Sequence, residues 1–421
     1  MIKETNEQNK NEITISNKQE IYINNNTKNI NNINNFNKNI LNNQKYKDYY
    51  QFNFNLENNN KIYNSMIPST QYIIRMSILL SKEKIGSKLV QMEYEGGNDE
   101  IKNEIFETLK KQIVPLSEDT FGNYVIQKIL FSGDIKKIDY IFDSIKGFLL
   151  DLSIHQNGCR VLQALIEILG VLKDKFSSGR EGQKCKEKLE IITEILIKNI
   201  SNLLYDQNGN HVIQKLIDAL DGDNINGIYS EILNYIQYDC KTNLLFNKYV
   251  SRIVQNLLYK LNELQKEKEN NNLIDIICDN NFDEICKNQY SNYILQLIIE
   301  NHKDKIEFIC NKLKGNIYNY SLDNYASYII QKIIEIGNSQ QRDQIGKEII
   351  ENNKSGNNEE NSIMELVKHK NGNFVIQKVI QFCSSDIKNQ IIKKIKINNY
   401  IKRGKYSKYV CNIIDRYNCS N

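Results

Sequence analysis

Apolar residues recur at helical spacing along most of the chain, but not in its first 65 residues. Ile138, Ile141 and Ile145 form one such stripe, which a helix with 3.6 residues per turn places on one face. The segment 1–65 is instead rich in asparagine and has no apolar stripe of helical or strand period. A tract of this kind buries too little apolar surface to offset the entropy of ordering. We therefore expect a disordered tail at 1–65 and a folded helical domain at 66–421.

A seven-residue string recurs eight times within this domain. Its copies share a glycine or a substitute for it in second place, an apolar pair in fifth and sixth place, and a final glutamine. The copies are IGSKLVQ at 85–91, FGNYVIQ at 121–127, NGCRVLQ at 157–163, NGNHVIQ at 208–214, YVSRIVQ at 249–255, YSNYILQ at 290–296, YASYIIQ at 325–331 and NGNFVIQ at 371–377. A ninth, weaker copy is YSKYVCN at 406–412.

The spacing of these strings predicts a helical solenoid. If the third residue of each string is position 1, neighbouring copies lie 36, 36, 51, 41, 41, 35 and 46 residues apart. A base period near 36 is typical of stacked helical hairpins. We expect two helices per repeat, the second beginning near the glycine, which would supply a positive φ in the turn. Val250, Ser291 and Ala326 replace that glycine, so their turns must use ordinary φ.

Polar inserts account for the longer spacings. The three inserts are KDKFSSGREGQKCKEK at 173–188, KEKENNN at 266–272 and NNKSGNNEEN at 352–361. Loops at a protein surface tolerate added length at little free-energy cost. We therefore expect all three inserts to be surface loops.

Two faces of the second helix can be distinguished within the string. Positions 3 and 4 are apolar in every copy, whereas positions 1, 2 and 5 fall on the opposite side of a helix and are predicted to face outward together. The expected core pairs are Leu89/Val90, Val125/Ile126, Val161/Leu162, Val212/Ile213, Ile253/Val254, Ile294/Leu295, Ile329/Ile330 and Val375/Ile376.

The outward positions carry a restricted set of side chains. Position 1 is Ser87, Asn123, Cys159, Asn210, Ser251, Asn292, Ser327 and Asn373. Position 2 is Lys88, Tyr124, Arg160, His211, Arg252, Tyr293, Tyr328 and Phe374. Position 5 is Gln91, Gln127, Gln163, Gln214, Gln255, Gln296, Gln331 and Gln377. Amides pair with base edges, and rings or guanidinium planes stack on base faces, so this set predicts single-stranded RNA as the ligand.

These strings resemble the repeats of the PUF (Pumilio) family, in which each helical repeat reads one RNA base. The resemblance covers about residues 70–417, and YSKYVCNIIDRY at 406–417 resembles the family's C-terminal half-repeat. The half-repeat expected before residue 73 has no clear counterpart. The resemblance implies an all-α, right-handed superhelical α-solenoid of eight PUF-type repeats plus terminal half-repeats.

The family's reading rule implies a target sequence. Asn with Gln resembles the uracil pattern, and Ser or Cys with Gln resembles the adenine pattern. Since binding in the family is antiparallel, the expected target is 5′-U-x-U-A-U-A-U-A-3′. The x belongs to Ser327, Tyr328 and Gln331, where Pumilio-like members carry Ser, Asn and Glu and read guanine. Glutamine has one acceptor and two donors on its amide, so we expect adenine, or adenine and guanine alike, at this place.

Four lysines directly follow the glutamine, at Lys128, Lys215, Lys332 and Lys378. They are either contacts to the RNA backbone or ordinary solvated helix residues, and the sequence leaves both interpretations open. Lys88 lacks a flat face, so the first repeat is expected to hold the 3′ base least tightly.

Composition narrows the remaining classes of function. The formal net charge of +4 permits nucleic-acid binding without indicating it. Nine cysteines and four well-separated histidines show no metal or disulfide framework, so we expect reduced thiols, no metal and no cofactor. The sequence contains no secretory signal, membrane-spanning stretch or catalytic motif, which predicts a protein that is not an enzyme.

The resemblance also implies a biological role. It predicts a cytoplasmic, monomeric regulator that binds the 3′ untranslated regions of messenger RNAs and represses translation or hastens decay. Its expected partners are a deadenylase complex and other translational regulators. Two alternatives stay open: a PUF-like ribosome-biogenesis factor, whose reading residues are typically degraded, and a protein-binding α-solenoid of the armadillo or HEAT kind. Neither alternative requires glutamine at position 5 in all eight copies.

Overall fold

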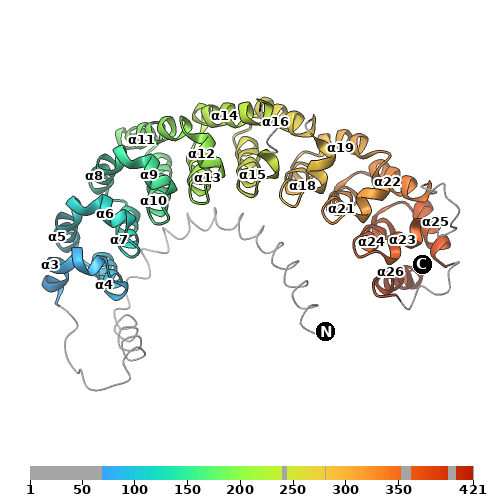
Figure 1. Cartoon of the computed structure of the whole chain (residues 1–421), viewed down its shortest axis with the longest axis horizontal. Coiled ribbons are helices and arrows are strands. Elements are labelled where there is room, and N and C mark those ends of the chain that lie inside the picture. Colours follow the sequence, from blue (N-terminus) through green and yellow to red (C-terminus); the bar gives the residue numbers. More distant parts are fainter. Residues whose placement is uncertain (1–68, 239–243, 280, 352–361, 397–403, 421) are drawn as a thin grey trace, which may run out of the picture.

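The helices of the computed structural model stack into one open arc (Figure 1). The structure describes residues 69–238, 244–279, 281–351, 362–396 and 404–420, and all regular elements in these ranges are helices. The tail predicted at 1–65 lies outside the described residues. The stacked all-α architecture agrees with the solenoid expected from the repeat period.

The second to eighth repeats each contain three helical elements rather than the two that were predicted, whereas the first repeat has only α3 and α4. Long outer helices follow the convex side of the arc and inner helices line its concave side (Figure 1). The outer helices are α3 (Thr70–Ser81), α5 (Asp99–Leu109), α8 (Ile135–Ile145), α11 (Arg180–Ile197), α14 (Ile225–Tyr238), α16 (Glu267–Asp279), α19 (Ile306–Leu313), α22 (Ser339–Glu351) and α25 (Ser385–Lys396). The inner helices are α4 (Lys84–Gly96), α7 (Gly122–Phe131), α10 (Gly158–Lys175), α13 (Gly209–Ala219), α15 (Lys248–Glu263), α18 (Asn292–Asn301), α21 (Ala326–Ile336), α24 (Gly372–Phe382) and α26 (Ser407–Ser420).

Short helices connect the two layers, and the periodicity of the sequence did not separate them from the outer helices. They are α6 (Ile113–Glu118), α9 (Leu149–Ile154), α12 (Ile200–Tyr205), α17 (Phe282–Lys287), α20 (Ile317–Leu322) and α23 (Ser362–Lys368). The equivalent element in the fifth repeat is the 3₁₀ turn η5 (Leu244–Phe246). Further 3₁₀ turns are η2 (Lys110–Gln112), η3 (Lys146–Phe148), η4 (Gly222–Asn224) and η6 (Lys303–Lys305).

Two of the three predicted surface loops are helical. The insert 173–188 lengthens both α10 and α11, leaving only a short turn between Lys175 and Arg180. The insert 266–272 forms the first part of α16. Both segments are rich in lysine and glutamate, which are good helix formers, so polar composition alone was a poor indicator of a loop. The third insert, 352–361, lies outside the described residues.

The core lies between the inner and outer layers and is continuous along the arc. The predicted apolar pairs at positions 3 and 4 are buried in all eight inner helices, except that Leu89 is only half-buried. In α13 the next turn contributes as well, since Leu216 and Ile217 are fully buried with Val212 and Ile213. The inner helices from α7 to α24 each pack against the inner helix on either side, and α4 and α26 end the row.

The glycine before position 1 serves close packing rather than a positive φ. Gly158 begins α10, and a Cβ added there would lie 2.7 Å from Cδ2 of Leu152 in α9. Gly209 has the same relation to Leu203 in α12, at 2.9 Å. Neither glycine has a positive φ. The prediction of a positive-φ turn was wrong, because the constraint is the approach of the inner helix to the short helix.

None of the helices in the described ranges combines the length and apolar composition needed to cross a bilayer.

Candidate RNA-reading surface

Every inner helix from α7 to α24 begins at a turn held by one side chain. This residue lies four places before position 1 and accepts hydrogen bonds from two backbone N–H groups at the start of the helix. Oδ1 of Asp206, for example, accepts from N of Asn208 at 2.8 Å and N of Gly209 at 2.7 Å. The residues in this role are Asp119, His155, Asp206, Asn247, Asn288, Asp323 and His369. Satisfying these N–H groups fixes the entry of the helix and hence its position-1 side chain.

The sequence interpretation missed these acceptors, although their fixed offset from position 1 is visible in the sequence. It also missed an asparagine two places before position 1 in three repeats. Nδ2 of Asn157 donates to the Glu118 carbonyl at 3.0 Å, and Nδ2 of Asn208 donates to the Ile154 carbonyl at 2.8 Å. Asn371 does the same to Leu322 at 3.1 Å. These bonds join each inner helix to the short helix of the preceding repeat.

Position 1 lies at the floor of the surface and does not face solvent. All eight position-1 residues are buried, with exposed fractions between 0% for Asn210 and 4% for Cys159. The prediction that positions 1, 2 and 5 face outward together is therefore wrong for position 1. Position 1 falls in the first turn of the inner helix, and the Asn210 side chain is bonded there to the carbonyls of the preceding turn.

Asparagine at position 1 orients the glutamine at position 5. In the fourth repeat, Nδ2 of Asn210 donates to the carbonyls of Asp206 and Gln207 at 2.8 and 2.9 Å. Its Oδ1 then accepts a hydrogen bond from Nε2 of Gln214 at 2.9 Å. The same side-chain pair occurs in Gln127–Asn123, Gln296–Asn292 and Gln377–Asn373, at 2.9, 2.7 and 2.8 Å. These bonds use Nε2 and not Oε1 of each glutamine, and Nε2 of Gln214 also donates to the Asn210 carbonyl at 3.3 Å.

Serine at position 1 produces a different arrangement. Nε2 of Gln91, Gln255 and Gln331 donates to the backbone carbonyl of Ser87, Ser251 and Ser327 at 3.1, 3.0 and 3.2 Å. The shorter side chain leaves more room beside the glutamine than asparagine does. Cys159 is similarly small, and burial raises the pKa of its thiol, which therefore stays protonated at neutral pH. The eight repeats thus fall into the same two classes that the sequence separated.

Position 2 forms the exposed row of the surface. The exposed fraction is 42% for Tyr124, 47% for Tyr293, 53% for Tyr328 and 44% for Phe374, and Lys88, Arg160, His211 and Arg252 are also exposed. Position 5 is half-buried in all eight helices, between this row and the position-1 floor. On each inner helix, position 1 is therefore the most buried of the three, position 5 is intermediate and position 2 is the most exposed.

Charge varies along this row. Burial, Arg252 and Lys248 together lower the pKa of His211, so its ring is neutral at neutral pH. Arg160 lies beside Tyr124, and its Nη1 donates to the tyrosine hydroxyl at 3.0 Å. The central repeats therefore offer guanidinium planes flanking a neutral imidazole, whereas the sixth to eighth repeats offer aromatic rings.

The lysines that follow the glutamines are not isolated on the surface. Lys128 pairs with Glu95 at 3.1 Å and Lys215 with Glu167 at 3.0 Å, and Lys332 and Lys378 pair with Glu300 and Glu335. Each partner belongs to the inner helix of the preceding repeat. Neither sequence interpretation of these lysines included such a pairing.

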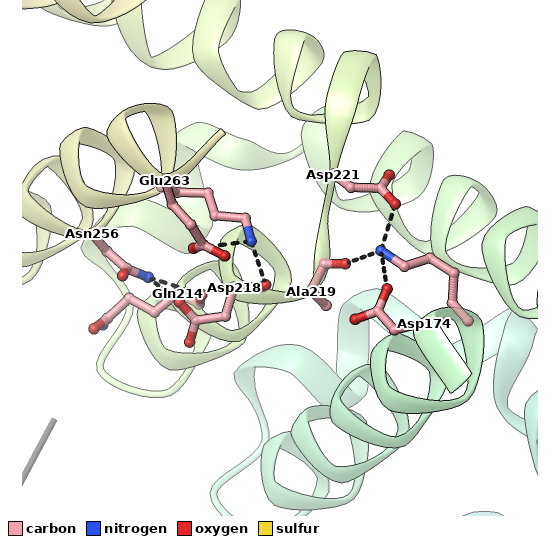
Figure 2. A network of polar contacts seen from close by, with 9 residues as sticks. Asp174, Gln214, Asp218, Ala219, Asp221, Asn256 and Glu263 are labelled. Carbon is pink, nitrogen blue, oxygen red and sulfur yellow. Dashed lines mark hydrogen bonds and ion pairs between the residues drawn. The ribbon is translucent and has the colours of Figure 1, made fainter. Parts of the chain in front are cut away.

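The corresponding junction of the fourth and fifth repeats uses an asparagine and an aspartate instead of a lysine and a glutamate (Figure 2). Nδ2 of Asn256 donates to the Gln214 carbonyl and to Oδ1 of Asp218, both at 3.0 Å. Burial raises the pKa of the Asp218 carboxyl. On the other side of α13, Lys173 donates to the Ala219 carbonyl at 3.0 Å and pairs with Asp221 at 2.8 Å. A cation here interacts favourably with the C-terminal end of α13.

The ninth string differs from the eight others. In α26 the residue at position 1 is Lys408, which is exposed, and position 5 is Asn412, also exposed. Tyr409 at position 2 is 43% exposed, as in the aromatic repeats. This helix therefore keeps an exposed aromatic residue at position 2, but it lacks the buried residue at position 1 and the glutamine at position 5.

No group of three or more His, Cys, Asp or Glu side chains is placed to hold a metal ion within the part of the chain that the structure describes.

Comparison with protein families matches six segments of this chain. The family model described as "Pumilio-family RNA binding repeat" matches residues 112–146, 149–169, 199–233, 281–313, 316–350 and 362–396. The chain carries repeats of the Pumilio (PUF) family. The matched family is one of RNA-binding repeats and not of enzymes, in agreement with the prediction from the sequence. The strings of the first and fifth repeats, at 85–91 and 249–255, fall outside the matched segments.

Solved PUF structures share the fold. A crystal structure of PUF-8 in complex with PBE-RNA superposes with a TM-score of 0.69 at 22% identity, covering 88% of this chain and 99% of that one. A structure of the Puf3 RNA binding domain bound to a Cox17 RNA 3′ UTR recognition sequence gives a TM-score of 0.67 at 24% identity, covering 83% and 97%. At these identities the likeness shows the fold alone.

Curated relatives are longer than the region they share with this chain. Pumilio homolog 11 of Arabidopsis thaliana is 26% identical over 275 residues, which are 65% of this chain and 45% of the relative. Fem-3 mRNA-binding factor 1 of Caenorhabditis elegans is 25% identical over 246 residues, 53% of this chain and 37% of the relative. The PUF chain therefore spans about half or less of the length of these relatives.

Proposed function

We propose that this PUF chain binds single-stranded RNA sequence-specifically, with one base per repeat and the consensus 5′-U-[A/G]-U-A-U-A-U-A-3′. The observation that carries the proposal is the repeated geometry of position 5. Eight successive inner helices, which line the concave side of the arc, each carry a half-buried glutamine together with a buried position-1 residue and an exposed position-2 residue. An amide so held offers a donor and an acceptor to a base edge.

The two classes of floor support the assignment of bases. Asparagine fills the floor and joins its Oδ1 to the glutamine, which leaves room suited to the smaller pyrimidine ring of uracil. Serine and cysteine leave more space beside the glutamine, as the larger purine ring of adenine requires. Repeats two, four, six and eight then read uracil, and repeats one, three and five read adenine.

We further propose that the targets are 3′ untranslated regions of messenger RNAs in the cytoplasm, and that binding alters translation or decay. The similar Puf3 domain was solved bound to a 3′ UTR recognition sequence, and the worm relative is named as an mRNA-binding factor. Recruitment of a deadenylase complex by a monomeric protein is the route that the family resemblance implies.

A gel-shift titration of the full chain tests the binding proposal. Labelled UAUAUAUA should bind with clear preference over octacytidylate of equal length. Equal binding of both RNAs would instead point to a non-selective ribosome-biogenesis type of PUF protein. The absence of binding to either RNA would favour a solenoid that recognises proteins.

A further inference from the structure

The ion pairs between neighbouring inner helices follow a strict positional rule. Position 6 is the residue directly after the glutamine, and position 9 lies three residues later. Each lysine at position 6 pairs with the glutamate at position 9 of the preceding repeat. The pairs are Lys128–Glu95, Lys215–Glu167, Lys332–Glu300 and Lys378–Glu335, and we call them the rungs.

Carboxylates occur at position 9 only where the next repeat has a polar partner for them. Phe131 and Tyr259 occupy position 9 where the following position 6 is Ala164 and Leu297. Gln381 occupies it where the following residue is Ile413 of the ninth string. Asp218, the only other acid at this position in the eight repeats, accepts from Asn256 at 3.0 Å, as Figure 2 shows. Every position-6 lysine thus has its own glutamate, and every position-9 glutamate has its own lysine.

The rung lysines border the base-reading row. Position 6 lies one helical turn beyond position 2, so each lysine is on the same side of the inner helix as the stacking residue of its own repeat. The lysine side chains are partly accessible, with exposed fractions from 23% for Lys332 to 31% for Lys215. Unpaired lysines at these places would attract the phosphates of any RNA, whatever its sequence.

We propose that the four position-9 glutamates withhold the rung lysines from RNA phosphates, and so make the concave surface select RNA by base rather than by charge. This inference rests on the proposed function. A lysine already neutralised by a protein carboxylate releases no counterion when RNA binds, and a phosphate has to displace the carboxylate before it can contact the ammonium group. The glutamates are thereby specificity-determining groups that need not touch RNA.

Removing the carboxylates while keeping their shape tests the inference. The variant carries Glu95→Gln, Glu167→Gln, Glu300→Gln and Glu335→Gln in the full chain. Dissociation constants for UAUAUAUA and octacytidylate are measured across a series of salt concentrations. We expect the salt dependence of both to steepen by about 0.7 in log–log slope for each freed lysine, and octacytidylate to gain more affinity than UAUAUAUA.

A matched control keeps the same change in net charge. It carries Glu100→Gln, Glu194→Gln, Glu231→Gln and Glu307→Gln on the outer helices, and should leave the salt slopes close to wild type. A second control adds Lys128→Met, Lys215→Met, Lys332→Met and Lys378→Met to the rung variant, and should restore the shallow slope. If the fourfold variant does not fold, Glu335→Gln alone should still steepen the slope by about 0.7.

The outcomes separate this inference from the proposed function. If wild type does not distinguish UAUAUAUA from octacytidylate, the proposed function is wrong. If wild type is selective but the rung variants keep its salt slope and selectivity, the glutamates are only repeat-to-repeat contacts and the inference is overturned. A steeper slope that the outer-helix control reproduces would also overturn it.

Discussion

At the scale of single residues, we expect the base preference of the seventh repeat to depend on Gln331. This side chain is held by the Ser327 carbonyl, as in the other serine repeats. Replacing it by glutamate supplies two acceptors for the N1–H and N2–H of guanine. Gln331→Glu should shift the ratio of affinities for UGUAUAUA over UAUAUAUA upward by roughly tenfold, since hydrogen bonds to charged groups contribute about 1.5–3 kcal/mol. Competition binding with the two RNAs measures this ratio of affinities. An unchanged ratio would mean that Gln331 does not determine the base bound by the seventh repeat.

The stacking row makes a second prediction at this scale. Tyr293 is 47% exposed on the concave side, so its loss should leave the fold intact and remove one base contact. Tyr293→Ala should weaken binding of UAUAUAUA by about 1–3 kcal/mol. Tyr140→Ala on α8, where the tyrosine is 39% exposed, is the control and should bind as wild type does. Equal losses in both variants would mean that position 2 does not stack on RNA.

The sequence proposed twenty-four reading residues, and it placed the eight at position 1 at the wrong depth. A helical wheel gives the direction of a side chain around one helix, and Asn210 does point to the same side as Gln214. It does not show that the Asn210 amide is bonded back to the carbonyls of Asp206 and Gln207 and is buried there. The acceptors before the helix and the rung carboxylates were also missed, because their partners lie in the turn or in another repeat.

At the scale of elements, the start of α24 should respond to pH. Nδ1 of His369 accepts from N of Asn371 and N of Gly372 at 3.2 and 3.3 Å, which protonation of that nitrogen forbids. Burial and the charge of Lys370 lower the pKa of His369 below its ordinary 6.5. Folded protein therefore binds fewer protons than unfolded protein between the two pKa values. The stability contributed by this group is full above about 6.5 and is lost as pH falls through the lowered pKa.

The variant His369→Asn isolates this effect, since Asn247 and Asn288 already fill the same role. Between pH 7 and pH 5, wild type should lose about 1 kcal/mol more unfolding free energy than the variant. Urea unfolding at both pH values measures the difference, and His211 and His302, whose pKa values are also lowered, are present in both proteins. Parallel losses in the two proteins would rule out the role given to His369.

The helices and the core were predictable because apolar residues kept the helical period. The short helices were not, since η3 (Lys146–Phe148) interrupts a stripe that the apolar residues of α9 continue. The insert 173–188 was misread because charged residues suit an exposed helix as well as a loop. Its place in the structure depends on contacts that no local pattern contains, including Lys188 of α11 with Asp139 of α8 at 2.8 Å.

At the scale of the whole molecule, the lengthened α10 joins the third repeat to the fourth. Lys173→Met keeps the buried methylene chain and removes the ammonium group that binds the end of α13. We expect a loss of about 1–2 kcal/mol in unfolding free energy and faster amide exchange in the last turn of α13. Lys184→Met, on the exposed side of α11, should change neither quantity. Unaltered exchange in α13 after Lys173→Met would contradict the role of the insert.

The rungs also limit how such an array can be rebuilt. Neighbouring repeats meet through a lysine and a glutamate at some junctions, an alanine and a phenylalanine at another, and an asparagine and an aspartate at a third. If the second repeat were transplanted into the third place, the lysine equivalent to Lys128 would face Phe131. Its charge would then have no carboxylate partner at that junction. The repeats of this chain are therefore not interchangeable in position, and a repeat that is moved must carry its junction residues with it.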